Sequence, residues 1–334
     1  MKITSGKVVR IGFLCAAVLL TACQRGDKKV VIKVGDTWSA SHPIARSIDE
    51  VFKPQVEQKS EGAISVEVYH SGMLGNEQTL WDSVRNGSIE MVVVGSVMNS
   101  EYRPMLISDW PFLYRDINHA KKVWTGSFAE DFKKDFERQF PTTRMLSIGP
   151  NSARTFTSNR QLTSIADFQG QKFRMPSNPI HVGIVTDLGA SAQVIPLNEL
   201  FNALQTGVVD GQDNGMVTVL SEKLNEVQRF LYETNHIVAT MQLIVNAQFF
   251  EGLSAEHQTI VRNAAKDAAA WAWDEYIKSI DVDRRTLIES GITVTQLTDQ
   301  DREAIIERIQ PTLNRLYSEN NWAEELIRKV RDTQ

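Results

Sequence analysis

The first third of the chain has the hydrophobic pattern of a parallel α/β unit. Apolar or alternating stretches of strand length are separated by segments in which apolar residues recur at helical spacing. The pattern predicts strands over 30–34, 64–68 and 91–94, a helix after Pro43 and a helix over 77–85. Because residues 91–94 are all apolar, we expect that strand to be buried on both faces. Pro54 is expected to kink or end the first helix.

A second α/β unit follows a mainly helical stretch over 116–140. The pattern predicts strands over 144–148, 154–157, 172–175, 193–195 and 208–209, with helices over 181–188 and 198–205. Gly207 is a natural end for the last of these helices, since glycine readily takes the left-handed conformation. Pro150 and Asn151 are expected to mark the first crossing of the chain between the two units.

One long helical pattern dominates the C-terminal third. A strand over 236–247 is expected to return the chain to the first unit, and Ser254 then caps a pattern that runs over 255–290 without a breaker. At 1.5 Å per residue such a helix is about 50 Å long, so it must bridge two bodies or bend. The remaining predicted elements are a strand over 292–297 and a helix over 299–330 with a kink at Pro311.

The N-terminus has the features of an export signal. Three basic residues precede an apolar run over 11–20, which is too short to span a bilayer as a mature helix. The run ends in Leu-Thr-Ala-Cys, which is the kind of cleavage site found in bacterial lipoproteins. We expect residues 1–22 to be removed, Cys23 to be lipidated and residues 23–29 to form a tether. The alternative is an ordinary signal peptide that is cleaved nearby.

Composition and charge narrow the class of function. The chain has 334 residues, 42% hydrophobic and 23% charged, a balance typical of soluble globular proteins with two domains of ordinary size. Loss of the signal removes three basic and no acidic groups, which changes the formal charge from −5 to −8. No cluster of basic residues suggests nucleic acid or a lipid surface as a partner. A bound anion must therefore be captured by individual arginines in a pocket.

Sequence signatures of enzymes and cofactor sites are missing from the chain. It contains no Gly-x-Ser-x-Gly, Gly-x-Gly-x-x-Gly, phosphate-binding loop or His-Glu-x-x-His motif, and the mature chain keeps a single cysteine. The six histidines are scattered singly, so a structural or surface role is expected for each. We predict a binding protein with no metal, no cofactor and no catalytic residue.

Arg174 is the strongest candidate for binding an anion. It lies near the end of the predicted strand over 172–175, and Pro176 stops that strand immediately afterwards. Open α/β sheets bind ligands at such strand ends, and a guanidinium returns two charge-assisted hydrogen bonds to a carboxylate that leaves water. The alternative role is a salt bridge to one of the 41 acidic residues of the chain.

Two segments carry a family resemblance. Residues 159–174, Asn-Arg-Gln-Leu-Thr-Ser-Ile-Ala-Asp-Phe-Gln-Gly-Gln-Lys-Phe-Arg, and residues 203–214, Ala-Leu-Gln-Thr-Gly-Val-Val-Asp-Gly-Gln-Asp-Asn, resemble the solute-binding proteins of TRAP transporters, the DctP family. The resemblance extends more weakly over 30–316. It implies an extracytoplasmic, two-lobed periplasmic-binding-protein fold of the α/β class, in which each lobe is a sheet flanked by helices and a long helix spans both lobes. Lobe I would comprise 30–150 plus about 240–275, and lobe II 151–239 plus about 276–334.

The resemblance also implies further ligand contacts in lobe II. Arg154 stands where the family tends to have a second arginine, and a salt bridge at a strand end is its alternative role. Asn214 matches a polar contact to the ligand carboxylate. Asp213, just before it, stands where the family often has glutamate.

The candidates that would read the rest of the solute are less specific. Trp38 could stack on a sugar face or cap the core, and Glu77 could accept hydrogen bonds from hydroxyls or favour the start of a helix. Ser96 and Asn178 are weaker candidates. Gly95 stands where some sialic acid-binding relatives have an acidic contact, which argues against sialic acid.

These features together predict a monomeric receptor that captures a small organic acid in an interlobe cleft and delivers it to the membrane subunits of a TRAP transporter. The polar candidates favour a carboxylated sugar such as a uronate or aldonate, with a C4-dicarboxylate as the other possibility. Two alternatives have other functions. A sensory lipoprotein would present the solute to a receptor kinase or chemoreceptor, and an extracytoplasmic lyase or hydrolase would need a buried base that the sequence does not display.

Overall fold

The computed structural model describes residues 1–2 and 29–334. The predicted signal cleavage site, Cys23 and most of the tether therefore lie outside the described residues. The strands are β1 (Val30–Gly35), β2 (Ile64–Tyr69), β3 (Met91–Val94), β4 (Thr143–Ser158), β5 (Lys172–Met175), β6 (Ser191–Val194), β7 (Gly211–Asn214), β8 (Phe230–Asn246) and β9 (Thr293–Gln296). They form one mixed sheet in the order β2-β1-β3-β8-β4-β7-β5-β6, with β9 beside β8.

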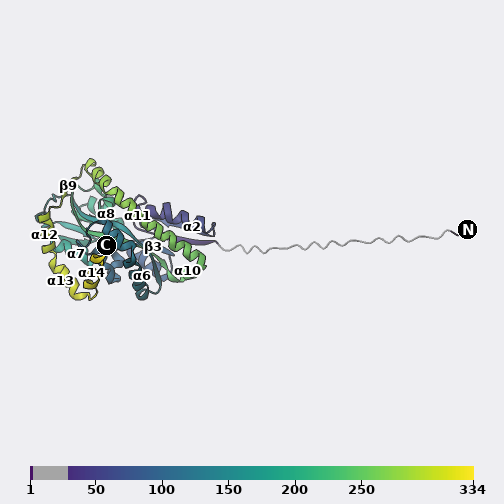
Figure 1. Cartoon of the computed structure of the whole chain (residues 1–334). Coiled ribbons are helices and arrows are strands. Elements are labelled where there is room, and N and C mark those ends of the chain that lie inside the picture. The colour runs from purple at the N-terminus through teal and green to yellow at the C-terminus, as the bar shows by residue number, and fades with distance from the viewer. Residues whose placement is uncertain (3–28) are drawn as a thin grey trace.

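Helices flank this sheet, and several ranges agree with the sequence pattern (Figure 1). The helices are α1 (Pro43–Ser47), η1 (Ile48–Phe52), α2 (Lys53–Lys59), α3 (Glu77–Asn86), α4 (Ser96–Glu101), η2 (Arg103–Asp109), α5 (Ile117–Thr125), α6 (Ser127–Gln139), η3 (Ile165–Phe168), α7 (Pro179–Asp187), α8 (Leu197–Gln205), α9 (Met216–Ser221), η4 (Leu224–Glu226), α10 (Ala247–Glu251), α11 (Ala255–Glu289), α12 (Asp299–Arg308), α13 (Gln310–Glu319) and α14 (Ala323–Asp332). No helix among residues 29–334 is both long and apolar enough to cross a bilayer.

Each half of the sheet is a parallel α/β unit, as the pattern predicted. β1 pairs in parallel with β2 and β3, and these three strands make the first half of the sheet. β5 pairs in parallel with β6 and β7, which together make the second half. All four residues of β3 are buried, in agreement with a strand covered on both faces.

Two long antiparallel strands join the halves. β4 and β8 pair along most of their length, and they also pair with β7 and β3, respectively. The separate strands predicted over 144–148 and 154–157 are therefore one strand, and the chain crosses between the halves without leaving the sheet. Pro150, which has no N–H to donate, lies at one of three register shifts in β4, where a strand tolerates proline.

The strand predicted over 208–209 was misplaced. Val208 and Val209 finish the turn after α8, where both backbone N–H groups point to Ala203 O. The strand is instead Gly211–Asn214, a run of residues with low strand propensity. A side chain on Gly211 would come within 2.3 Å of the carbonyl oxygen of Thr157, so this tight position requires glycine.

Two other predicted helices are divided more finely in the structure. The first contains a π turn over Ile48–Phe52, and Pro54 lies in the first turn of α2, where proline is tolerated. The single kinked helix predicted over 299–330 is three helices. Pro311 lies in the first turn of α13 rather than at a kink within one helix, and Asn320 adopts an extended conformation that separates α13 from α14.

The long helix was predicted correctly. α11 has 35 residues, which corresponds to about 52 Å, and Figure 1 shows it passing from the end that carries α2 and α10 to the end that carries β9 and α12. Its buried face packs in turn into three apolar clusters, through Val261, Trp273 and Leu287. α11 therefore spans both halves of the molecule.

Polar contacts fasten α11 to the two crossing strands. Trp273 Nε1 donates to Ile148 O at 3.2 Å, and the Tyr276 hydroxyl accepts from the backbone N–H of Ala153 at 2.6 Å. Arg284 forms an ion pair with Glu233 of β8. The helix is thus tied to β4 and β8 at the level where these strands pass between the halves.

We predict that Tyr276→Phe will lower the free energy of unfolding by about 1–2 kcal/mol, because the Ala153 N–H would lose its partner while the ring stays in place. Urea unfolding monitored by circular dichroism measures this change. Tyr317→Phe is the matched control, since Tyr317 is 43% exposed. Equal stability of the two variants would contradict the proposed role of the Tyr276 hydroxyl.

Candidate functional site

A cavity of about 210 Å³ opens where several parallel strands end. It lies beyond the carboxyl ends of β1, β3, β5 and β6, between the two halves of the sheet. Its lining residues are Thr37, Asn76, Glu77, Gln78, Val97, Arg174, Pro176, Ser177, Val194, Ile195, Pro196 and Leu197. Arg174 and Glu77 are the two predicted site residues that it brings together.

Arg174 is held rigidly at the cavity wall. It is the third residue of β5, paired with Gln193 on one side and Gln212 on the other, and its Nε donates to Ile195 O at 2.6 Å. The side chain is buried, yet no carboxylate within the described part of the chain forms an ion pair with it. Burial, together with the charge of Arg154, lowers the pKa of Arg174 to about 10. A buried guanidinium without a counter-ion is costly, and a bound carboxylate would offset that cost.

The position of Glu77 is compatible with both roles that the sequence left open, an acceptor for solute hydroxyls and the start of a helix. It is the first residue of α3, next to the cap residue Asn76, and it also lines the cavity. Its Oε1 accepts hydrogen bonds from the backbone N–H groups of Gly95 at 2.6 Å and Val97 at 3.0 Å. Burial raises the pKa of Glu77, and these two N–H groups and Arg174 act in the opposite direction. The carboxyl group is thus fixed in place as an acceptor.

Arg154 has a different environment from Arg174. It lies in β4 with only 2% of its side chain exposed, and it forms an ion pair with Asp213 of β7. Its guanidinium also donates to the backbone carbonyl of Asp213. Arg154 does not line the cavity, and its charge is compensated by Asp213. Asn214 is likewise buried behind the wall, where its Nδ2 donates to Gln212 Oε1 at 2.7 Å.

The structure favours the core role of Trp38 over a stacking role. Trp38 is 3% exposed and packs in the apolar cluster beneath β1. Its neighbour Thr37 lines the cavity instead, and the Thr37 hydroxyl oxygen is buried without a hydrogen-bond partner among the described residues. The sequence offered one signal for Thr37, its place in the loop that leaves the first strand.

Ser96 and Asn178 connect the two halves of the molecule rather than line the cavity. Asn178 caps α7 by accepting from the Ile180 N–H, and its Nδ2 donates to Ser96 O at 3.2 Å and to Asp109 Oδ2 at 2.8 Å. Its polar atoms are therefore already engaged. The sequence analysis named both residues as candidates for contact with the solute, and the cavity lining does not include them.

Further hydrogen bonds join the halves around the cavity. The Ser39 N–H donates to Glu222 Oε1 at 2.7 Å, and the Ser100 hydroxyl donates to Ser177 O at 2.7 Å. The loop that carries Ser39 is ordered in turn by the buried carboxylate of Asp36, which lies 2.6 Å from the Nδ1 of His70. Burial alone would lower the pKa of His70, but the hydrogen bonds and charges of Asp36 and of its neighbour Asp49 raise it to about 9.

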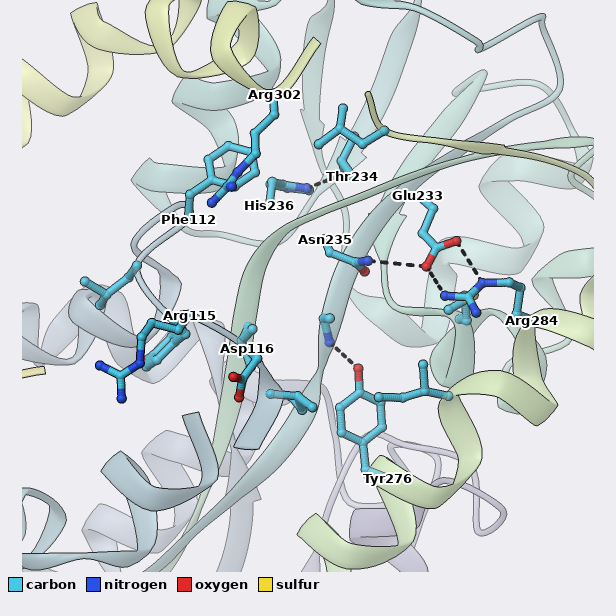
Figure 2. Close-up of a pocket in the computed structure, with 18 residues that line it drawn as sticks. Phe112, Arg115, Asp116, Glu233, Thr234, Asn235, His236, Tyr276, Arg284 and Arg302 are labelled. Atoms are coloured by element: carbon cyan, nitrogen blue, oxygen red, sulfur yellow. Dashed lines mark hydrogen bonds and ion pairs between the residues drawn. The ribbon is translucent and has the colours of Figure 1, made fainter. Parts of the chain in front are cut away.

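A second cavity of about 350 Å³ shares none of these lining residues. Figure 2 shows that Glu233 pairs with Arg284 in this cavity and that the Tyr276 hydroxyl meets a backbone N–H. The Arg302 guanidinium lies over the ring of Phe112, 5.3 Å from its centroid. We interpret this cavity as the space between α11 and the crossing strands rather than as the solute site.

Two halves of a sheet, a helix that spans both, and a cavity between them with a buried cation define the class of two-lobed solute receptors. The sequence matches the family described as bacterial extracellular solute-binding protein, family 7, over residues 34–320, and the chain belongs to this DctP family.

Several relatives carry the likeness along nearly the whole chain. A TRAP periplasmic solute-binding protein from Haemophilus influenzae, solved with bound L-gulonate, is 26% identical with a TM-score of 0.87, covering 92% of this chain and 100% of that one. The sugar acid-binding protein of Advenella mimigardefordensis, solved in complex with galactonate, is 25% identical with a TM-score of 0.87, covering 92% and 99%. The 2,3-diketo-L-gulonate-binding periplasmic protein of Escherichia coli is 29% identical over 264 residues, 77% of this chain and 78% of that protein.

Proposed function

We propose that this receptor captures a small sugar acid with a single carboxylate in the cavity beside Arg174 and delivers it to the membrane subunits of a TRAP transporter. The observation that carries the proposal is the buried Arg174 guanidinium, which lines the cavity and has no carboxylate partner within residues 29–334. A solute carboxylate would supply the missing charge and accept two parallel hydrogen bonds.

The charges around the cavity favour one carboxylate over two. Asp213 already compensates Arg154, so Arg174 is the cation left for the solute. Glu77 also lines the cavity, and a second solute carboxylate beside it would be repelled. Hydroxyl groups suit the remaining positions, because the Glu77 carboxyl group can accept from them and the Thr37 hydroxyl lacks a partner among the described residues.

Size and family context support the same class of solute. The cavity volume of about 210 Å³ is below the range of about 300–1,000 Å³ that is typical for drug-sized ligands, so a small molecule is favoured. One solved relative holds bound L-gulonate, and another is a sugar acid-binding protein in complex with galactonate. The family consists of binding receptors, and our proposal is for binding without turnover. No feature of the cavity favours the sensory or the enzymatic alternative.

In this proposal the solute contacts both lobes. Lobe I comprises 30–150 with about 240–275, and lobe II comprises 151–239 with about 276–334. Arg174 would bind the carboxylate, Glu77 and Thr37 would bind hydroxyls, and Arg154, Asn214, Asn178 and Ser96 would support the wall from behind. We also propose that the receptor is a monomer outside the cytoplasm, anchored by lipidated Cys23.

Arg174→Ala and Arg174→Lys should both weaken sugar acid binding by about thirtyfold to several thousandfold, because removal of one partner of a desolvated charge pair costs about 2–5 kcal/mol. Calorimetry with L-gulonate, galactonate and glucuronate provides the measurement. Arg160→Ala is the control, since the Arg160 side chain is 54% exposed and lies away from the cavity lining. An affinity of Arg174→Ala within threefold of the parent would remove the basis of the proposal.

In a thermal-shift screen, the three sugar acids should raise the melting temperature more than succinate does at equal concentration. A ligand at 100 times its dissociation constant adds about 2.7 kcal/mol to the stability of the folded state. Glu77→Gln should reduce the difference in melting-temperature shift between the sugar acids and succinate, because it removes the charge that repels a second carboxylate. If succinate gave the largest shift with the parent chain, the preference for a single carboxylate would be wrong.

Cys23→Ser should release the protein from the membrane fraction and leave solute affinity unchanged, because the anchor and the cavity are separate parts of the chain. Membrane fractionation in high salt shows whether Cys23→Ser is released from the membrane. The intact mass of the purified native protein shows whether its N-terminus is lipidated. Membrane association of Cys23→Ser, or an unmodified N-terminus on the native protein, would refute lipidation at this residue.

A further inference from the structure

Four charged or titratable side chains from four elements meet behind the cavity wall. His181 of α7 lies between Asp213 of β7 and Asp109 at the end of η2, with Nδ1 3.1 Å from Asp213 Oδ2 and Nε2 3.5 Å from Asp109 Oδ1. Asp213 is also paired with Arg154 of β4. None of these side chains is more than 2% exposed. The group therefore forms a chain, Arg154, Asp213, His181, Asp109, that is closed to solvent.

The geometry determines which form of the imidazole fits. Both ring nitrogens of His181 face carboxylate oxygens, so a neutral ring would turn a lone pair toward one of them. Nε2 of His181 and Oδ1 of Asp109 are buried and have no hydrogen-bond partner within the described part of the chain, and each is the nearest complement of the other. An imidazolium satisfies both carboxylates.

The surrounding charges agree with a protonated ring. Burial and the charge of Arg154 lower the pKa of His181, but Asp213 and Asp109 outweigh them and raise it above the ordinary value. His236 of β8, 3.5 Å from Asp213, has its own pKa lowered by burial and remains neutral at pH 7. His181 is thus the histidine of this group that carries charge.

We propose that His181 is a positioning residue of the solute site: as an imidazolium between Asp109 and Asp213, it balances the buried charge and leaves the positive charge of Arg174 for the solute. This proposal rests on the solute site inferred above. With His181 protonated, two carboxylates balance Arg154 and the imidazolium. With His181 neutral, the buried group has one net negative charge, which opposes the capture of an anion by the neighbouring Arg174.

The same contacts give His181 a mechanical role. Asp109 uses its other oxygen, Oδ2, to accept from Asn99 at 2.9 Å and from Asn178 at 2.8 Å. Asn178 in turn donates to Ser96 O of the other half of the molecule. His181 and Asn178 of the second half of the molecule therefore both contact Asp109 of the first half.

The charge on His181 can be observed without any solute. Long-range ¹H–¹⁵N NMR of the ¹⁵N-histidine-labelled full-length protein at pH 7 should show both His181 nitrogens protonated, with the signals assigned from their loss in His181→Gln. A neutral His181 tautomer at pH 7 would overturn the proposal. If His181→Gln does not fold, Asp109→Asn serves instead, because it removes the carboxylate facing Nε2 and should make the His181 signals those of a neutral ring.

The effect on binding is measured by calorimetry with L-gulonate, galactonate and glucuronate between pH 6 and 8.5, a range in which Arg174 keeps its charge. The parent chain should lose affinity as the pH rises through the raised pKa of His181. His181→Gln should bind about tenfold more weakly at pH 7 and show a flat profile over the same range. His119→Gln is the control, since this buried histidine of α5 contacts Val330 O and lies away from the cavity.

Each remaining outcome has a distinct meaning. Equal affinity and an equal pH profile of His181→Gln and the parent chain would overturn the positioning role even if the ring is charged. A loss in His119→Gln as large as that in His181→Gln would show that the effect is one of stability, which also overturns it. If none of the three acids binds the parent chain, the proposed solute class is wrong, whereas the NMR spectrum still decides the charge of His181.

Discussion

The antiparallel pairing of β4 and β8 is the constraint on which the rest of the structure depends. These two strands pair with each other through both halves of the sheet. The parallel strands of the first half continue the sheet beyond β8, and those of the second half continue it beyond β4. The carboxyl ends of the parallel strands from both halves then face one shared space, which is where the cavity lies. The fastening of α11 to the same two strands fixes the relation between the halves.

The same pairing explains why two arginines on neighbouring strands differ in function. Arg154 is on β4 and lies beside β7, so Asp213 forms an ion pair with its guanidinium. The charge of Arg154 is therefore neutralised inside the protein. Arg174 is on β5, on the far side of β7, and its guanidinium has a backbone carbonyl but no carboxylate within the described residues. A shift of the strand pairing by one residue would turn each of these side chains to the opposite face of the sheet. Register therefore decides which cation is free to bind a solute.

Elements with a strong local pattern were predictable from the sequence. The unbroken pattern over 255–290 predicted α11, and Pro176 after the short strand over 172–175 placed Arg174 near a strand end. β7 was missed because Gly-Gln-Asp-Asn has no strand propensity, and its backbone is held only by neighbours that are distant in sequence. The two adjacent valines were the stronger local signal, but Val209 packs in an apolar cluster and Val208 is exposed.

The sequence predicted a site residue only where the type and position of that single residue indicated its role. Arg174 and Glu77 were predicted and both line the cavity, but a single sequence could not show that Asp213 would pair with Arg154 or that the Asn178 amide would bind Asp109. The histidines are scattered singly along the sequence, yet His181 and His236 both approach Asp213 in the structure. Such meetings depend on tertiary contacts between residues far apart in the chain, for which one sequence holds no local signal.

The hydrogen bonds of Ser39 and Ser100 across the cavity have a thermodynamic consequence. They join the two halves with no solute involved, so part of the free energy of closure is supplied by the protein itself. Bonds that already hold the halves together lower the ordering cost of the bound state, so they contribute to affinity without touching the solute.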